Sequence, residues 1–207
     1  MKKTLTTMLG ICISLSALAA SPSAPQPLFD GRTFDGWEGN ESMFRIVDGA
    51  IVGGTLAERI ARNEFLCTKR EFGDFELRLK FKLLGDNKPN AGVQFRSERI
   101  PKHHEVIGYQ ADLGEGYWGA LYDESRRKRV LASGDAAEID KVLRRNEWND
   151  YVIRAEGPHI QLWINGSQTV NYTEPDDAIA RRGIIGLQIH AGAPSEAWYK
   201  DITIQEL

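Results

Sequence analysis

The segment from Phe75 to Leu83 constrains the fold more than any other part of this sequence. Apolar residues at positions 75, 77, 79, 81 and 83 alternate with charged residues at 76, 78, 80 and 82. Because successive side chains of a strand point to opposite faces, this alternation predicts a β-strand with one face in the core and one in solvent. The chain is therefore expected to form a sheet that is buried on one side only.

Other short strands follow the same logic along the chain, with turn signals between them. Asp48-Gly49 and Asn165-Gly166 are the strongest turn dipeptides, and they predict hairpins over residues 44–54 and 159–172. A strand is also expected over 117–122, and the best helical pattern covers only 136–145. Many short strands without a long helix favour an all-β fold of antiparallel sheets, either a sandwich or a barrel.

The N-terminus has the pattern of a secretory signal peptide. Lys2 and Lys3 precede an apolar stretch, and Ala17-Leu18-Ala19 supplies the small residues that a signal peptidase recognises. We expect a signal peptide over residues 1–20, a flexible leader over 21–27 and a single domain over 28–207. The protein is then periplasmic or secreted from a bacterium, with no membrane anchor after cleavage.

The charge and the cysteine content exclude some classes of ligand and of covalent cross-link. The net charge is −3 at pH 7 and becomes more negative once Lys2 and Lys3 are removed, which argues against nucleic acid as a partner. Cys12 leaves with the signal, so Cys67 has no partner within the chain and no disulfide is expected. Its apolar neighbours Phe65 and Leu66 favour a buried cysteine over a nucleophile.

Three predicted strands carry an outer face that differs from that of an ordinary solvated strand. They present amides together with one guanidinium, one carboxylate or one imidazole: Gln94 and Arg96, Gln110 and Asp112, Gln188 and His190. In one sheet, these groups would line a concave surface suited to hydroxyl-rich ligands, since each makes directional hydrogen bonds. Tyr122, Trp118 and Trp163 are further candidates for sugar binding, the tryptophans as stacking plates.

Each of these residues also has a purely structural interpretation. Arg96 can pair with an acid at the surface, Asp112 can form a turn, and the polar face of the Gln188 and His190 strand can simply be solvated. His103, His104 and Glu105 have the composition of a metal site, but adjacent histidines on a strand point apart. We therefore favour a loop there and keep Glu105 alone as a candidate. Glu124, beside the basic run 126–129, is a further candidate for the cleft.

The order and spacing of several motifs resemble the bacterial 3-keto-disaccharide hydrolase family, formerly a domain of unknown function within the concanavalin A-like lectin/glucanase superfamily. The matching motifs span nearly the whole mature chain: Leu28-Phe29-Asp30-Gly31, Gly36-Trp37, Ala91-Gly92-Val93-Gln94-Phe95-Arg96-Ser97, Gly108-Tyr109-Gln110-Ala111-Asp112, Glu147-Trp148-Asn149-Asp150-Tyr151 and Gly186-Leu187-Gln188-Ile189-His190. The resemblance implies a jelly-roll sandwich of two antiparallel sheets with a concave ligand face. It also implies cleavage of glycosides oxidised at C3.

A ketone at C3 acidifies the hydrogen at C2, so the expected path is deprotonation at C2, elimination at C1 and hydration. This path needs a base, a stabiliser of negative charge and an acid. Our hypothesis takes the base as His190 or Glu105, the stabiliser as Arg96 and the acid as Asp112 or Glu124. Gln94, Gln110 and Gln188 would orient hydroxyl groups.

Two questions stay open at this level. A divalent metal could replace Arg96 as the stabiliser, and no cofactor is certain. A carbohydrate-binding module or lectin on the same fold, or a conventional glycoside hydrolase, are the alternative functions, because a fold does not determine an activity.

Overall fold

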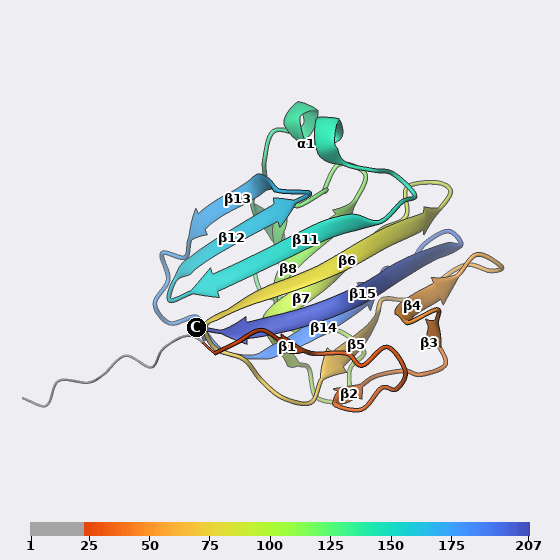
Figure 1. Cartoon of the computed structure of the whole chain (residues 1–207), viewed down its shortest axis with the longest axis horizontal. Coiled ribbons are helices and arrows are strands. Elements are labelled where there is room, and N and C mark those ends of the chain that lie inside the picture. The colour runs from red at the N-terminus through yellow and green to blue at the C-terminus, as the bar shows by residue number, and fades with distance from the viewer. Residues whose placement is uncertain (1–22) are drawn as a thin grey trace, which may run out of the picture.

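The computed structural model describes residues 23–207 and consists of two antiparallel sheets packed face to face (Figure 1). This confirms the predicted all-β sandwich. The eight-stranded sheet, in front in Figure 1, has the order β13 (Ser167–Thr173), β12 (His159–Ile164), β11 (Asn149–Glu156), β6 (Phe75–Gly85), β15 (Ser195–Glu206), β4 (Ala50–Thr55) and β3 (Phe44–Val47), with β1 (Gln26–Pro27) paired to β15.

The seven-stranded sheet lies behind it and holds the polar strands singled out above. Its order is β10 (Arg129–Ala132), β9 (Leu121–Glu124), β8 (Val106–Gly114), β7 (Asn90–Arg99), β14 (Ile184–Ile189), β5 (Glu64–Thr68) and β2 (Trp37–Glu38). One short helix, α1 (Ala136–Val142), connects β10 to β11 and is capped by the Asp135 carboxylate, which accepts from the N–H groups of Ala137 and Glu138.

The core fills the space between the two sheets. From β6, Leu77, Leu79 and Phe81 are buried in it, whereas Arg78 on the other face is exposed, as the alternation predicted. From the facing sheet, β14 contributes Leu187 to the same cluster. The residues between these core positions on the seven-stranded sheet therefore occupy its outer face.

Both predicted hairpins are confirmed and share one turn geometry. Asp48 and Gly49 have φ of 50° and 74°, and Asn165 and Gly166 have φ of 48° and 82°. Two consecutive left-handed residues make the turn whose twist matches a β-hairpin, and Asp-Gly and Asn-Gly adopt it at low cost. Asp48-Gly49 joins β3 to β4, and Asn165-Gly166 joins β12 to β13.

Three local predictions differ from the structure. The strand expected over 117–122 begins only at Leu121, because Tyr117 and Ala120 close turns through hydrogen bonds to Gly114 and Tyr117. The helix expected over 136–145 ends at Val142. Residues 23–27, expected in a flexible leader, hydrogen-bond to β15 through Ser23 and through β1. The expected signal peptide lies outside the described residues.

Cys67 is a buried free thiol, as expected, and burial raises its pKa to about 12. No helix within residues 23–207 is both long and apolar enough to cross a membrane.

Two buried tyrosines of the eight-stranded sheet reach across the core to the backbone of the other sheet. The Tyr199 hydroxyl donates to the carbonyl of Gln188 at 2.7 Å and also lies 3.2 Å from that of Gly92. The Tyr151 hydroxyl lies 3.4 Å from the carbonyl of Asp112. Gln188, Gly92 and Asp112 are direct neighbours across β14, β7 and β8. Hydrogen bonds from the core side therefore fix the backbone of this row in the seven-stranded sheet.

Replacing Tyr199 with Phe should lower the free energy of unfolding by about 1–2 kcal/mol, because a buried hydrogen bond is lost without a change in packing. Urea denaturation measures this as a lower midpoint with an unchanged m-value. Tyr117→Phe is the matched control, since Tyr117 is 46% exposed, and it should leave the midpoint unchanged. Equal stability of Tyr199→Phe and the parent protein would contradict this role.

Candidate active site

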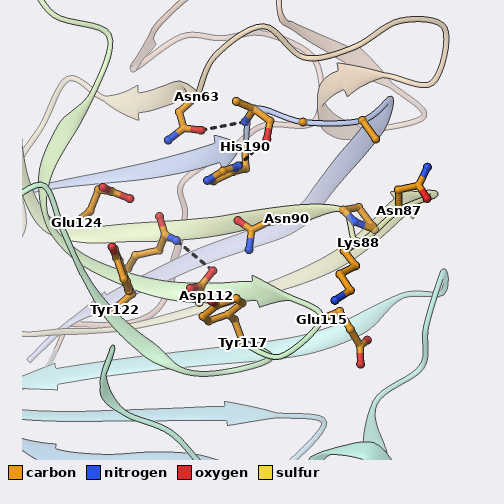
Figure 2. Close-up of a pocket in the computed structure, with 15 residues that line it drawn as sticks. Asn63, Asn87, Lys88, Asn90, Asp112, Glu115, Tyr117, Tyr122, Glu124 and His190 are labelled. Atoms are coloured by element: carbon orange, nitrogen blue, oxygen red, sulfur yellow. Dashed lines mark hydrogen bonds between the residues drawn. The ribbon is translucent and has the colours of Figure 1, made fainter. Parts of the chain in front are cut away.

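A cavity of about 510 Å³ opens on the outer face of the seven-stranded sheet (Figure 2). Its volume lies within the range of about 300–1,000 Å³ that is usual for small-molecule sites. The lining combines carboxyl groups, amides, tyrosines and one histidine: Asn63, Asn87, Lys88, Pro89, Asn90, Gln110, Asp112, Glu115, Tyr117, Tyr122, Glu124, His190, Ala191, Gly192 and Ala193. Each of the three segments with a predicted polar outer face therefore contributes residues to one cavity.

The register of the strands explains this meeting. Gln94, Gln110 and Tyr122 are direct neighbours across β7, β8 and β9, so their side chains share a face. Gly92 stands in the next row, beside Asp112, and a Cβ there would lie only 2.7 Å from the Gln110 side chain. The missing side chain of Gly92 leaves the room that Gln110 occupies.

A directional chain of side-chain hydrogen bonds runs along this face toward Asp112. Ser97 Oγ lies 3.3 Å from Gln94 Oε1, Gln94 Nε2 donates to Gln110 Oε1, and Gln110 Nε2 donates to Asp112 Oδ1 at 3.1 Å. Since each amide uses its oxygen as acceptor and its nitrogen as donor, the chain has one polarity and orients the Gln110 amide. Gln94 is fully buried, so it acts behind the cavity and not at its surface.

The carboxyl group of Asp112 has a raised pKa. Burial raises its pKa to about 7, against the opposing effect of hydrogen bonds from Gln110 and from the backbone N–H of Leu113. Burial has this effect because it penalises the charged form more than the neutral one. Asp112 therefore keeps its proton to a higher pH than an exposed aspartate does.

His190 faces the same cavity from the end of β14. Its Nδ1 lies 2.7 Å from the carbonyl of Ala191, which can only accept, so Nδ1 carries the hydrogen. In the neutral ring, this leaves Nε2 with a free lone pair. Asn63 fixes the neighbouring backbone by accepting from the N–H of Ala191 at 2.9 Å. Figure 2 shows His190 and Asp112 on opposite sides of the cavity with Asn90 between them.

Glu124 and Glu105 form an acidic pair beside this histidine. Glu124 lines the cavity, and its pKa is raised by burial and by the charge of Glu105, and lowered by that of His190. Glu105 does not line the cavity. Its Oε1 accepts from Asn63 at 3.0 Å, and its buried Oε2 has no protein partner among the described residues. Glu105 therefore supports the site from behind.

Arg96 does not reach the cavity, so its expected place beside Gln94 is wrong. A β-bulge interrupts the pairing of β7 with β8 between Phe95 and Glu98, and Arg96 has φ of 44°, which turns its side chain away from that face. The buried guanidinium bonds to the carbonyls of Gly73 and Gly157 and to Asp74 at 2.7 Å. Gly157 belongs to the turn between β11 and β12, so Arg96 ties the two sheets together.

Three other predicted site residues do not line the main cavity. Gln188 lies on the expected face but is fully buried, and both of its amide atoms lack a protein partner among the described residues. Trp163 alternates with the core residues Leu162 and Ile164 on β12, so it stands on the outer face of the eight-stranded sheet, away from the cavity. Trp118 lines a smaller hollow next to the cavity.

Several lining residues were not singled out from the sequence. Asn90 is two residues before Gly92 and four before Gln94 on one strand, so the period of two could have identified it. Asn63 precedes β5, Lys88 lies in the connection between β6 and β7, and Tyr117 lies in a turn, so no periodicity applies to them. Among residues 23–207, no group of three His, Cys, Asp or Glu side chains is arranged to hold a metal ion. The divalent metal stays an untested prediction.

The profile of the 3-keto-alpha-glucoside-1,2-lyase-like domain matches residues 24–205. The chain therefore belongs to this family, which confirms the resemblance based on its motifs. No curated protein matches the chain.

Solved structures share the fold at low identity. A Parabacteroides distasonis protein, provisionally described as a glycosyl hydrolase, has 21% identity and a TM-score of 0.66, over 89% of this chain and 100% of that one. The carbohydrate-binding module CBM66 from Bacillus subtilis has 16% identity and a TM-score of 0.63, over 83% and 96%. The carbohydrate recognition domain of Emp47p has 13% identity and a TM-score of 0.59, over 91% and 98%. Family and fold together define a carbohydrate-related protein.

The titration of Asp112 makes a prediction about stability. A carboxyl group whose pKa is higher in the folded than in the unfolded state, here about 7 against 3.8, destabilises the fold as it ionises. The parent protein should therefore lose stability relative to Asp112→Asn as the pH rises from 4 to 7, by up to about 4 kcal/mol. Urea denaturation of both proteins across this range measures the difference.

Gln168→Ala at an exposed position of β13 is the matched control, because neither side chain ionises, and its difference from the parent protein should stay nearly constant with pH. A constant difference for Asp112→Asn as well would show that Asp112 ionises normally.

Proposed function

We propose that the protein cleaves glycosides that carry a ketone at C3, by proton removal at C2 followed by elimination at C1. The observation that carries this proposal is that His190, whose Nε2 has no hydrogen-bond partner among residues 23–207, faces the buried carboxyl group of Asp112 across one polar cavity (Figure 2). The family description, a 1,2-lyase acting on 3-keto-alpha-glucosides, supports the same bond cleavage.

The chemistry needs no attack on the unactivated sugar. His190 Nε2 takes the hydrogen of C2 as a proton, and the bonding pair forms an enolate that places negative charge on the C3 oxygen. The enolate then re-forms the C3 ketone, C1 and C2 become doubly bonded, and the C1–O bond breaks. Asp112 protonates the departing oxygen. Water added across C1 and C2 completes the hydrolysis and returns both residues to their starting states.

The cavity offers substitutes for the role first given to Arg96. Asn90 and Tyr122 line the cavity and carry hydrogen-bond donors, so they are the groups that we assign to the C3 oxygen. Glu124 interacts electrostatically with His190, and its negative charge would stabilise the imidazolium that forms there. Gln110, oriented through Gln94, would hold a sugar hydroxyl.

The predicted signal peptide implies that the substrate is met in the periplasm or outside the cell. A lectin-like module remains the competing function, and it differs in one outcome, since it would bind the sugar and release no product.

His190→Gln should lower kcat on a methyl α-glucoside oxidised at C3 by a factor of about 10²–10⁴, the usual contribution of a general base. His159→Gln is the matched control, because this histidine lies on β12 of the other sheet, where it contacts Asn171. It should leave kcat unchanged. Release of methanol or of the free sugar measures the rate.

Full activity of His190→Gln would remove this residue from the mechanism. Cleavage of the unoxidised methyl glucoside by the parent protein at a comparable rate would indicate a conventional glycosidase, and binding without product would indicate a lectin.

A further inference from the structure

Two polar residues are connected to the ring of His190 through the backbone of Ala191. Asn63 lies beside this histidine, and its Oδ1 accepts from the N–H of Ala191 at 2.9 Å (Figure 2). Asn63 Nδ2 donates to Glu105 Oε1 at 3.0 Å. The carbonyl of Ala191 in turn lies 2.7 Å from His190 Nδ1. A continuous series of contacts therefore joins the Glu105 carboxylate to the imidazole.

The two ends of this series fix the orientation of the Asn63 amide. A backbone N–H can only donate and an ionised carboxylate can only accept, so the amide satisfies both in one orientation alone. If it were turned over, its NH₂ group would face the N–H of Ala191 and its oxygen would face the carboxylate of Glu105. Glu105 therefore orients Asn63, and Asn63 orients Ala191.

Backbone contacts on either side restrict Ala191 further. Gly192 exchanges two hydrogen bonds of 3.0 Å with the backbone of Ile60. The carbonyl of Asn63 lies 3.0 Å from His104 Nδ1, which must carry the hydrogen because a carbonyl only accepts. The segments 60–63 and 190–192 are thus joined at several points, and the carbonyl of Ala191 keeps a fixed direction.

The direction of this carbonyl matters because it decides which ring nitrogen can take a proton. Nε2 of His190 acts as a base only in the neutral tautomer whose hydrogen is on Nδ1. The hydrogen bond made by one ring nitrogen selects the tautomer. Since the acceptor here is a backbone carbonyl, the groups that orient Ala191 determine the share of His190 that can act.

We propose that Asn63 and Glu105 are positioning residues for His190, and that they hold its ring, through Ala191, in the tautomer that leaves Nε2 free. The proposal rests on the proposed function for the use of Nε2 as a base. It gives Glu105 a role other than that of the base itself, which agrees with its place outside the cavity lining.

The test reads the position of the hydrogen directly, by ¹⁵N NMR of protein labelled at its four histidines. The signals of His190 are those missing from His190→Gln. At about pH 9, where imidazole is ordinarily neutral, Nδ1 of the parent protein should have the shift of a protonated nitrogen and Nε2 that of an unprotonated one. Asn63→Ala and Glu105→Ala should each bring the two shifts closer together, because both tautomers are then populated.

Asn40→Ala is the matched control, because Asn40 makes the same pair of contacts elsewhere. Its Nδ2 donates to Glu64 Oε1 at 3.0 Å, and its Oδ1 accepts from the N–H of Ser42 at 3.2 Å. Within residues 23–207, none of its side-chain hydrogen bonds is made to the backbone that holds His190. Asn40→Ala should therefore leave the shifts of His190 unchanged.

Kinetics on methyl α-glucoside oxidised at C3 supply a second readout. Glu105→Ala removes no group from the cavity lining, so it should lower kcat about threefold and leave KM unchanged. Glu105→Gln keeps an acceptor oxygen for Asn63 and should restore the kcat of the parent protein. When Asn63 is already alanine, Glu105→Ala should lower kcat no further, because the contact through which it acts is gone.

Unchanged shifts of His190 in both Asn63→Ala and Glu105→Ala would overturn the proposal. An equal loss of kcat in Glu105→Gln and Glu105→Ala would also overturn it, since the carboxylate would then act by its charge. If Asn63→Ala does not fold, the shifts of His190 in Glu105→Ala and Glu105→Gln give the answer alone.

The NMR measurement needs no turnover, so it separates this proposal from the proposed function. If the parent protein cleaves no 3-keto-glycoside, the proposed function fails, and the tautomer of His190 still shows whether Asn63 and Glu105 position the ring. If cleavage occurs and the tautomer does not respond to either residue, the positioning role fails alone.

Discussion

The candidate site depends on hydrogen bonds that cross the hydrophobic core. Tyr199 and Tyr151 belong to the sheet that has no part in the cavity, yet their hydroxyls reach the carbonyls of Gln188, Gly92 and Asp112. These three residues form one row of the opposite sheet, directly beneath the cavity. Strands that are held from below cannot shift in register without breaking buried hydrogen bonds, so the outer face stays fixed where it must position a small ligand.

The chemistry of the site depends on how the side chains are held on the outer face of the seven-stranded sheet. The amides of Gln94 and Gln110 form a chain of single polarity that ends on Asp112. Burial raises the pKa of this carboxyl group, while His190 is held in the tautomer that leaves Nε2 free. A buried carboxyl group and an imidazole of fixed tautomer thus share one cavity, and their states are set by different means, desolvation in one case and a backbone hydrogen bond in the other. Such a pair suits proton transfer at a ketone-activated carbon more than attack on an unactivated glycoside.

The sequence predicts features that depend on local periodicity and misses those that depend on the path of the chain. Alternation in β6 and the Asp-Gly and Asn-Gly turns were enough for the sandwich, because strand and turn preferences are local. The polar face was found for the same reason. Arg96 was misplaced because its left-handed backbone at a bulge carries no marker such as glycine. Trp118 and Trp163 could not be told apart, since their separation depends on which sheet each segment joins.

In the proposed mechanism, the C2 hydrogen leaves as a proton before the glycosidic bond breaks. The most direct measurement is the rate of cleavage of a 3-keto-glycoside that carries deuterium at C2, compared with the unlabelled compound under single-turnover conditions. Proton removal at C2 predicts a slower reaction of the labelled compound and its loss of deuterium to solvent. Equal rates, with the deuterium retained at C2 of the product, would contradict it.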